Sequence, residues 1–165
     1  MYFELTDHFA VAADPRRCWA FFATADNLPL ITPPWLGFRV MHGGAEPIRQ
    51  DALLDYTVRW MGVPVKWRTR IIDWSPPRQF IDLQVRGPYA LWMHQHQFEP
   101  MSGGGTDCRD RVVYRLPLPA VGRLVHAAIV RRQLLEIFRF RRRAIDEHLG
   151  SLRPLQADVR IEPLG

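Results

Sequence analysis

The chain has few of the features that mark a secreted, membrane-spanning or disulfide-stabilised protein. Its 165 residues include only two cysteines, Cys18 and Cys108, and reduced thiols in a cytoplasmic protein are the usual state for so small a number. No apolar run approaches the roughly 20 residues that a membrane-spanning helix needs. The first residues include the acidic Glu4 and no basic cluster. The sequence therefore predicts no signal peptide and a cytoplasmic location.

Lysine is almost absent, because Lys66 is the only lysine among 22 basic residues. Residues 109 to 143 hold ten arginines and two acidic residues, a local charge of +8, whereas the whole chain has a net charge of +5. The segment has no nucleic-acid-binding motif, and aromatic residues do not alternate with its arginines. We expect no nucleic-acid partner. We interpret the arginines as a solvated helix face, with an anionic membrane surface as the less favoured alternative; they include Arg131, Arg132 and Arg141 to Arg143.

Turn-forming residues divide the chain into short segments that alternate in polarity, which is the pattern of antiparallel strands. The length corresponds to one domain. The predicted strands are Phe3–Ala12, Phe38–His42, Ala52–Trp60, Val65–Trp74, Gln79–Arg86, Tyr89–Glu99 and Thr106–Leu116.

The predicted helices lie near the two ends of the chain. Asp14 and Pro15 are typical of a helix start, and a short helix is expected over Pro15 to Ala23. A second short helix is expected from Asp26 to Thr32, ended by two prolines. A long amphipathic helix is predicted from about Ala120 to Leu149. One long helix after a run of antiparallel strands predicts an α+β fold, a curved sheet of about seven strands wrapped around that helix.

The stretch from Gly87 to Phe98 points most directly to function. At the period of a strand, Trp92, His94, His96 and Phe98 share one face. Polar tips within an apolar wall are typical of a small-molecule pocket. Two histidines that only form hydrogen bonds inside a packed core are the structural alternative.

The same parity argument selects further candidates for the wall of a pocket. Tyr56, Trp67 and Tyr114 fall on the inward faces of their strands, and Leu135 and Phe138 on the inner face of the long helix. Such large side chains can fill a core or leave a hollow. We expect a pocket of several hundred Å³ between sheet and helix, as is typical of small-molecule sites.

The order of elements and several motifs resemble the helix-grip fold of the START-like (SRPBCC) superfamily, and within it a bacterial subgroup described as polyketide cyclase/dehydrase-like. The resemblance covers residues 1 to 149, which we expect to form the ligand-binding domain, with residues 150 to 165 as a C-terminal tail. The motifs that carry it are Pro76-Pro77-x-x-Phe80, Asp82-x-Gln84, Gly87-Pro88-Tyr89, Trp92-x-His94-x-His96-x-Phe98, Asp110-x-Val112-x-Tyr114 and Arg132 through Arg141.

The resemblance and the hydrophobic pattern disagree about one strand. The resemblance implies that Asp82 and Gln84 are functional and face inward, which requires a longer turn or a bulge before the next strand. Hydrophobicity instead places Ile81, Leu83 and Val85 inward. Both orientations remain open from the sequence.

Three functions are compatible with these observations. We favour binding of a small hydrophobic, ring-containing molecule, with His94, His96 and the two polar residues of the disputed strand orienting a polar group. The alternatives are a cyclase or dehydrase that uses His94 as a general base, beside Asp82, and an interaction module that acts through the basic helix.

No cofactor and no metal site are expected. The two histidines have the same-face spacing of zinc ligands on a strand, but a catalytic zinc needs a third protein ligand. Glu99 lies on the opposite face of the strand. The ligand's identity and the oligomeric state do not follow from the sequence.

Overall fold

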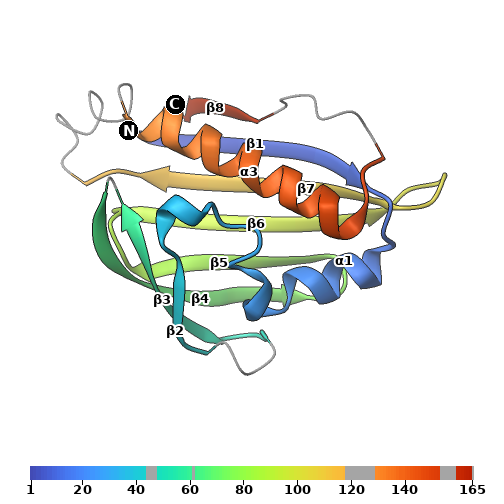
Figure 1. Cartoon of the computed structure of the whole chain (residues 1–165), viewed down its shortest axis with the longest axis horizontal. Helices are drawn as coiled ribbons and strands as arrows, with labels where there is room; N and C mark the ends of the chain where they lie inside the picture. Colours follow the sequence, from blue (N-terminus) through green and yellow to red (C-terminus); the bar gives the residue numbers. More distant parts are fainter. Residues whose placement is uncertain (44–47, 61, 118–128, 153–158, 165) are drawn as a thin grey trace.

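An eight-stranded antiparallel sheet forms the framework of the protein (Figure 1). The computed structural model describes residues 1–43, 48–60, 62–117, 129–152 and 159–164. The sheet order is β2-β3-β4-β5-β6-β7-β1-β8. The strands are β1 (Tyr2–Val11), β2 (Arg39–His42), β3 (Leu53–Trp60), β4 (Val63–Ser75), β5 (Gln79–Arg86), β6 (Leu91–Pro100), β7 (Thr106–Arg115) and β8 (Arg160–Leu164).

The first seven strands agree closely with the sequence prediction, and the predicted α+β, helix-grip architecture is confirmed. Inward and outward side chains alternate as expected along β7, where Cys108, Val112 and Tyr114 are buried and Arg109 and Arg111 are exposed. Period-two patterning marks these strands because one face of the sheet is covered and the other meets solvent.

The eighth strand comes from the segment that the sequence analysis set apart as a tail. β8 pairs antiparallel with β1, and Ile161 lies opposite Leu5. Ile161 is buried together with Phe3 and Val159. Residues 160 to 164 therefore belong to the sheet and cover an edge of β1 that would otherwise be unpaired.

The short helices follow β1, as expected, although the second differs in form. α1 (Pro15–Phe22) begins at Asp14, whose carboxylate accepts hydrogen bonds from the backbone of Arg16 and Arg17. The chain then forms two 3₁₀ turns, η1 (Ala25–Asn27) and η2 (Pro34–Leu36), in place of a helix over 26 to 32. Pro34 begins a turn because its missing N–H is not needed there.

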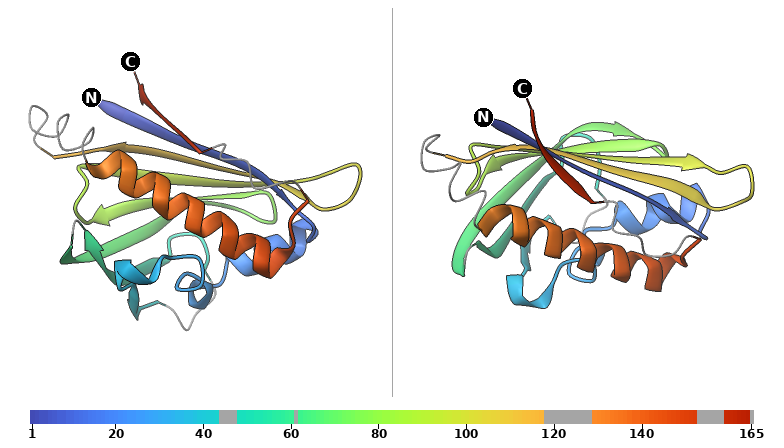
Figure 2. Two further views of the ribbon diagram at one scale, coloured as in Figure 1. Left: turned by 45° about the horizontal axis from the view of Figure 1, so that its top comes forward. Right: turned by 90° about the horizontal axis from the view of Figure 1, so that it is seen from above.

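The long helix α3 (Arg131–Leu149) crosses the same face of the sheet that carries α1 (Figures 1 and 2). The predicted start at about Ala120 lies outside the described residues. α3 ends at Gly150, whose φ of +77° suits glycine and where a Cβ would stand 2.9 Å from that of Ala12. Within the described residues, no helix is long and apolar enough to cross a membrane.

Two arginines of α3 correct the interpretation of a solvated basic face. Arg141 and Arg142 are buried, at 8% and 6% exposure, and form ion pairs with the buried carboxylates of Asp110 and Asp7. Arg143 is exposed. Buried charges occur where they are paired, so two of the three consecutive arginines belong to the interior.

Candidate functional site

An apolar pocket of about 200 Å³ lies on the concave face of the sheet. It is smaller than the several hundred Å³ expected from the sequence. Its wall is formed by strands β3 to β6, helix α3 and the segment that carries η1 and η2, with Phe22 of α1 and Ile48 beside them. The wall formed by the segment of η1 and η2 was not anticipated, and its pocket residues are Leu28, Ile31, Thr32, Leu36 and Phe38.

Most of the residues selected from the sequence come together around this pocket. The sheet contributes the aromatic and polar side chains, and the helix contributes Phe138. The predicted residues that line it are Tyr56, Trp67, Asp82, Trp92, His94, His96 and Phe138.

Phe98 and Tyr114 are not among the pocket-lining residues, although both lie on the inward face as predicted. Phe98 is buried against the ring of Phe22, with ring centroids 4.9 Å apart. Tyr114 is buried beside Phe3, at 5.6 Å. These two side chains are part of the packed core at either end of the sheet face.

Gln84 and Leu135 are also absent from the pocket wall. The Gln84 side chain donates a hydrogen bond to the backbone carbonyl of Tyr89 at 2.7 Å and so ties the β5–β6 connection. On α3 the wall is formed by Gln133, Leu134, Ile137, Phe138 and Arg141. Leu135, one residue after Leu134, is half-buried beside the core.

The structure settles the orientation of β5 in favour of an inward Asp82. Asp82 lies opposite His94 in the register of β5 and β6, and Phe80 lies opposite His96. Four residues, 87 to 90, connect the two strands. This longer connection, which the resemblance required, brings the polar residue to the pocket, and Val85 is left exposed.

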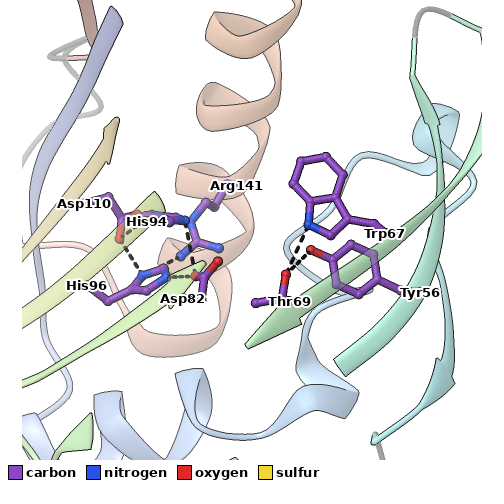
Figure 3. Close-up of polar contacts among 8 residues, drawn as sticks. All are labelled: Tyr56, Trp67, Thr69, Asp82, His94, His96, Asp110 and Arg141. Carbon is purple, nitrogen blue, oxygen red and sulfur yellow. Dashed lines mark hydrogen bonds and ion pairs between the residues drawn. The ribbon is translucent and has the colours of Figure 1, made fainter. Parts of the chain in front are cut away.

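His94 and His96 lie between two carboxylates, as Figure 3 shows. On one side, Asp110 Oδ1 is 2.7 Å from His96 Nδ1 and 3.3 Å from His94 Nε2. On the other, Asp82 Oδ2 is 3.3 Å from His96 Nε2 and 3.8 Å from His94 Nδ1. Asp82 lines the pocket, whereas Asp110 is only 4% exposed and lies behind the rings.

Arg141 completes the buried side of this cluster. Its Nε donates a hydrogen bond to Asp110 Oδ2 at 3.1 Å, and its Nη2 lies 3.3 Å from His96 Nδ1. Burial by itself would raise the pKa of Asp110, but the positive charge of Arg141 and the contacts with both histidines hold that pKa well below its usual range. Asp110 is therefore an ionised acceptor for the ring N–H groups.

The two imidazoles have opposite pKa shifts although they are neighbours. Burial lowers the pKa of His94, and the charge of His96 lowers it further. Burial also acts to lower the pKa of His96, but the carboxylate of Asp110 and the hydrogen bonds to Asp110 and Asp82 outweigh it, so the pKa is raised. One ring thus favours the neutral form and the other the protonated form.

Aromatic contacts hold both rings in place. His96 stacks on Phe80, with centroids 4.2 Å apart, and His94 lies 3.8 Å from His96. Phe138 of α3 contacts the outer side of His94 at 5.8 Å. The imidazoles are fixed between a strand and the helix before any ligand arrives.

A second polar group lies on the opposite wall of the pocket (Figure 3). The buried Thr69 hydroxyl accepts a hydrogen bond from Trp67 Nε1 at 3.1 Å and lies 3.0 Å from the Tyr56 hydroxyl. Burial raises the pKa of Tyr56 well above its ordinary value, so this phenol stays neutral and can donate or accept a hydrogen bond.

Asp110 and Arg141 are charged residues of the candidate site that the sequence reasoning missed. A signal existed for each. Asp110 shares the inward parity of Val112 and Tyr114, and Arg141 follows Phe138 by three residues on the inner face of the helix. A charged residue at an inward position is unfavourable by itself. Here each charge is explained by its ion-pair partner on the other element.

The structure removes the sequence-based argument against a metal site. The carboxylate of Asp82 supplies the third same-face ligand that the sequence reasoning did not find, and the ligand atoms of Asp82, His94 and His96 all lie within 4.8 Å of one another. The arrangement can bind a cation, or it can hold and transfer a proton at a ring nitrogen that faces the pocket.

Residues 11–139 match the family described as polyketide cyclase/dehydrase and lipid transport proteins. The chain belongs to that family. No curated protein matches the sequence. Membership in the polyketide cyclase/dehydrase and lipid transport family supports hydrophobic-ligand binding or cyclase activity in general terms.

Solved structures of bacterial proteins share the fold at low sequence identity. Protein TTHA0849 from Thermus thermophilus is 18% identical, with 88% of this chain and 96% of that chain covered and a TM-score of 0.65. A START superfamily protein from Mycobacterium smegmatis is 13% identical, with 92% and 99% covered and a TM-score of 0.65.

The comparison also includes a di-domain aromatase/cyclase, StfQ from the steffimycin biosynthetic pathway. It is 15% identical, with a TM-score of 0.64, and the alignment covers 91% of this chain and 53% of that chain. The predicted START-like relationship is thereby confirmed at the level of the fold.

Proposed function

We propose that the protein binds a small hydrophobic, ring-containing molecule in the pocket, with a polar group of that molecule placed against Asp82, His94 and His96. The observation that carries the proposal is a mainly apolar, aromatic pocket whose wall holds two hydrogen-bonded polar groups, Tyr56 with Thr69 and Asp82 with the histidines. Apolar walls supply affinity, and a few fixed polar groups set orientation.

The size of the pocket limits the ligand. An apolar cavity of about 150 Å³ accommodates benzene, and the volume here is about 200 Å³. A molecule of one or two fused rings fits this volume.

A matched pair of probes tests the proposal. Naphthalene and 1-naphthol have the same rings, and only the second has a hydroxyl group. Both are expected to change the tryptophan fluorescence, because Trp67 and Trp92 line the pocket. Naphthol is expected to bind more tightly, because its hydroxyl can pair with the polar groups on the wall.

Variants then show which side chains contribute to binding. Trp92→Ala is expected to weaken the binding of both probes. Asp82→Asn and His94→Ala should mainly reduce the preference for 1-naphthol over naphthalene. Trp35→Ala is the matched control, because Trp35 is 47% exposed and is not a pocket residue. Equal binding by wild type and Trp92→Ala, or saturable binding by neither probe, would reject the proposal.

An enzyme of the cyclase or dehydrase kind is the second candidate, and it is favoured by one observation. Burial keeps the His94 ring in its neutral form, and its Nδ1 faces Asp82 at the pocket wall. Such a ring can accept a proton from a carbon next to a carbonyl group and later return one. Exchange of those hydrogens in 2-tetralone for deuterium, followed by NMR, should be catalysed by wild type and lost in His94→Ala.

The interaction-module hypothesis has less support. It required a solid interior and an exposed arginine face. The pocket removes the first requirement, and the burial of Arg141 and Arg142 weakens the second.

A further inference from the structure

Three potential ligand atoms converge at one end of the pocket. Asp82 Oδ2 lies 3.3 Å from His96 Nε2 and 3.8 Å from His94 Nδ1. Ligand atoms that bind one metal tetrahedrally through bonds of about 2.0–2.1 Å stand roughly 3.3 Å apart. Two of the three distances in this group are therefore close to those of a metal centre, and all three ligand atoms lie within 4.8 Å of one another.

The hydrogen-bond directions of the two rings point to a cation at the same place. Asp110 is ionised because Arg141 pairs with it, and it lies against Nδ1 of His96 and Nε2 of His94. Those nitrogens hold the ring protons that face Asp110. The other nitrogen of His94 then presents a lone pair toward the Asp82 carboxylate, and a positive charge is needed between the two. The other nitrogen of His96 holds a proton in its hydrogen bond to Asp82, and a metal ion that binds there displaces that proton.

The Arg141 contact does not remove this requirement. Its Nη2 lies 3.3 Å from His96 Nδ1, but the Asp110 oxygen is closer to the same nitrogen, at 2.7 Å. His94 Nε2 is buried and has no hydrogen bond of good geometry among the described residues. Its contact with Asp110 at 3.3 Å is the interaction that orients it.

The surroundings match those of metal-binding histidines in other respects. A histidine ligand commonly donates its second ring N–H to a carboxylate, which fixes the tautomer and the ring orientation. Asp110 lies in that position 2.7 Å from His96 Nδ1 and, with poorer geometry, 3.3 Å from His94 Nε2. Phe80 stacks on His96, and Phe138 packs beside His94 with ring centroids 5.8 Å apart. The ligand set is thus oriented in advance.

We propose that Asp82, His94 and His96 form a two-histidine, one-carboxylate site for a divalent first-row transition metal, open to the pocket. Imidazole ligands select zinc and its neighbours over magnesium and calcium, which prefer oxygen. The two carboxylates and Arg141 give the cluster a net negative charge when both rings are neutral, so a divalent cation is electrostatically acceptable. The open coordination positions would face the apolar pocket, where an oxygen atom of a bound molecule could occupy one. The proposal goes beyond the function proposed above and does not depend on it.

The test measures metal binding directly. Protein treated with a chelator is dialysed against Zn²⁺, and the zinc retained per chain is measured by mass spectrometry. Co²⁺ is added in a parallel titration, because its visible absorption reports the ligands and their geometry. We expect one metal per chain and absorption typical of a four- or five-coordinate site. Asp82→Asn and His94→Ala should each weaken binding at least tenfold.

His8→Ala is the matched control, because His8 also contacts an aspartate, Asp107, but lies on the surface. It should bind zinc like the wild type. Circular dichroism shows whether each variant is folded, and Asp82→Asn, which keeps the shape of the side chain, remains informative if His94→Ala does not fold. Loss of all zinc from folded wild type would overturn the proposal and leave a proton as the cation. Zinc binding that is unchanged in Asp82→Asn but lost in His8→Ala would also overturn it.

Discussion

The buried charges beside the pocket show how strongly a single residue depends on its partners. Asp110 is in contact with Arg141, His94 and His96 and is almost fully buried. A buried ion pair adds little net stability relative to an apolar pair, because both ions lose their hydration. Removing one member is costly, because the other stays buried without compensation.

Asp110→Ala should therefore lower the free energy of unfolding by about 3–5 kcal/mol, since Arg141 would be left as a buried unpaired charge. Urea denaturation measures the change. The control is Asp55→Ala, which removes the partner of Arg68 in an exposed ion pair and should have a much smaller effect. Equal losses in the two variants would contradict the role assigned to Asp110.

The arginines of α3 allow a second prediction from neighbouring positions. Arg142→Ala leaves Asp7 buried without its ion-pair partner. This variant should lower the free energy of unfolding by about 3–5 kcal/mol. Arg143 is exposed, so Arg143→Ala should change the free energy of unfolding by less than about 0.5 kcal/mol. Thermal denaturation of both variants under one condition decides the point, and similar midpoints would show that Arg142 is not buried in solution.

At the scale of elements, β8 and α3 cover different parts of the sheet. β8 adds its hydrogen bonds to the outer edge of β1 and its apolar side chains to the cluster around Leu5. α3 covers the concave face and provides one wall of the pocket. An unpaired edge strand invites association with another chain, so β8 shields this edge of β1 as well as stabilising the sheet.

Ile161→Ala tests the contribution of β8. Ile161 is buried against the cluster beneath β1, and removing a buried isoleucine side chain should cost about 2 kcal/mol or more. Glu162 is exposed on the same strand, so Glu162→Ala should be close to neutral. Chemical denaturation of both variants provides the comparison. A neutral result for Ile161→Ala would mean that β8 does not pack in solution.

At the scale of the whole molecule, the pocket lowers the stability of the folded state, and a bound ligand can restore that stability. The residues around it belong to both buried clusters of the core, and the cavity leaves their inner surfaces without contacts. Binding to the folded state alone stabilises that state by mass action.

A ligand of the proposed kind at 100 times its dissociation constant should raise the free energy of unfolding by about 2.7 kcal/mol. Thermal denaturation with and without 1-naphthol measures this. Ile137→Trp is the companion variant, because Ile137 lines the pocket and a larger ring there should occupy the space. The variant should fold and lose the ligand-dependent shift; an unchanged shift would place the ligand elsewhere.

Local patterning was sufficient to predict most of the elements. The strand segments, the capped start of α1 at Asp14 and the end of α3 at Gly150 agree with the structure. They could be predicted because alternation, capping and turn chemistry act between residues that are close in sequence. The pairing of His94 and His96 on one face follows from the same period-two rule.

Contacts between elements could not be predicted in this way. The inward position of Asp82 depends on the register of β5 against β6. The roles of Asp110 and Arg141 depend on where α3 crosses the sheet, and β8 depends on the free edge of β1. The sequence alone determined the strands, the amphipathic helix and the aromatic and imidazole inventory of one face. Only tertiary packing decided which buried charges meet, because register and crossing position are set by many long-range contacts acting together.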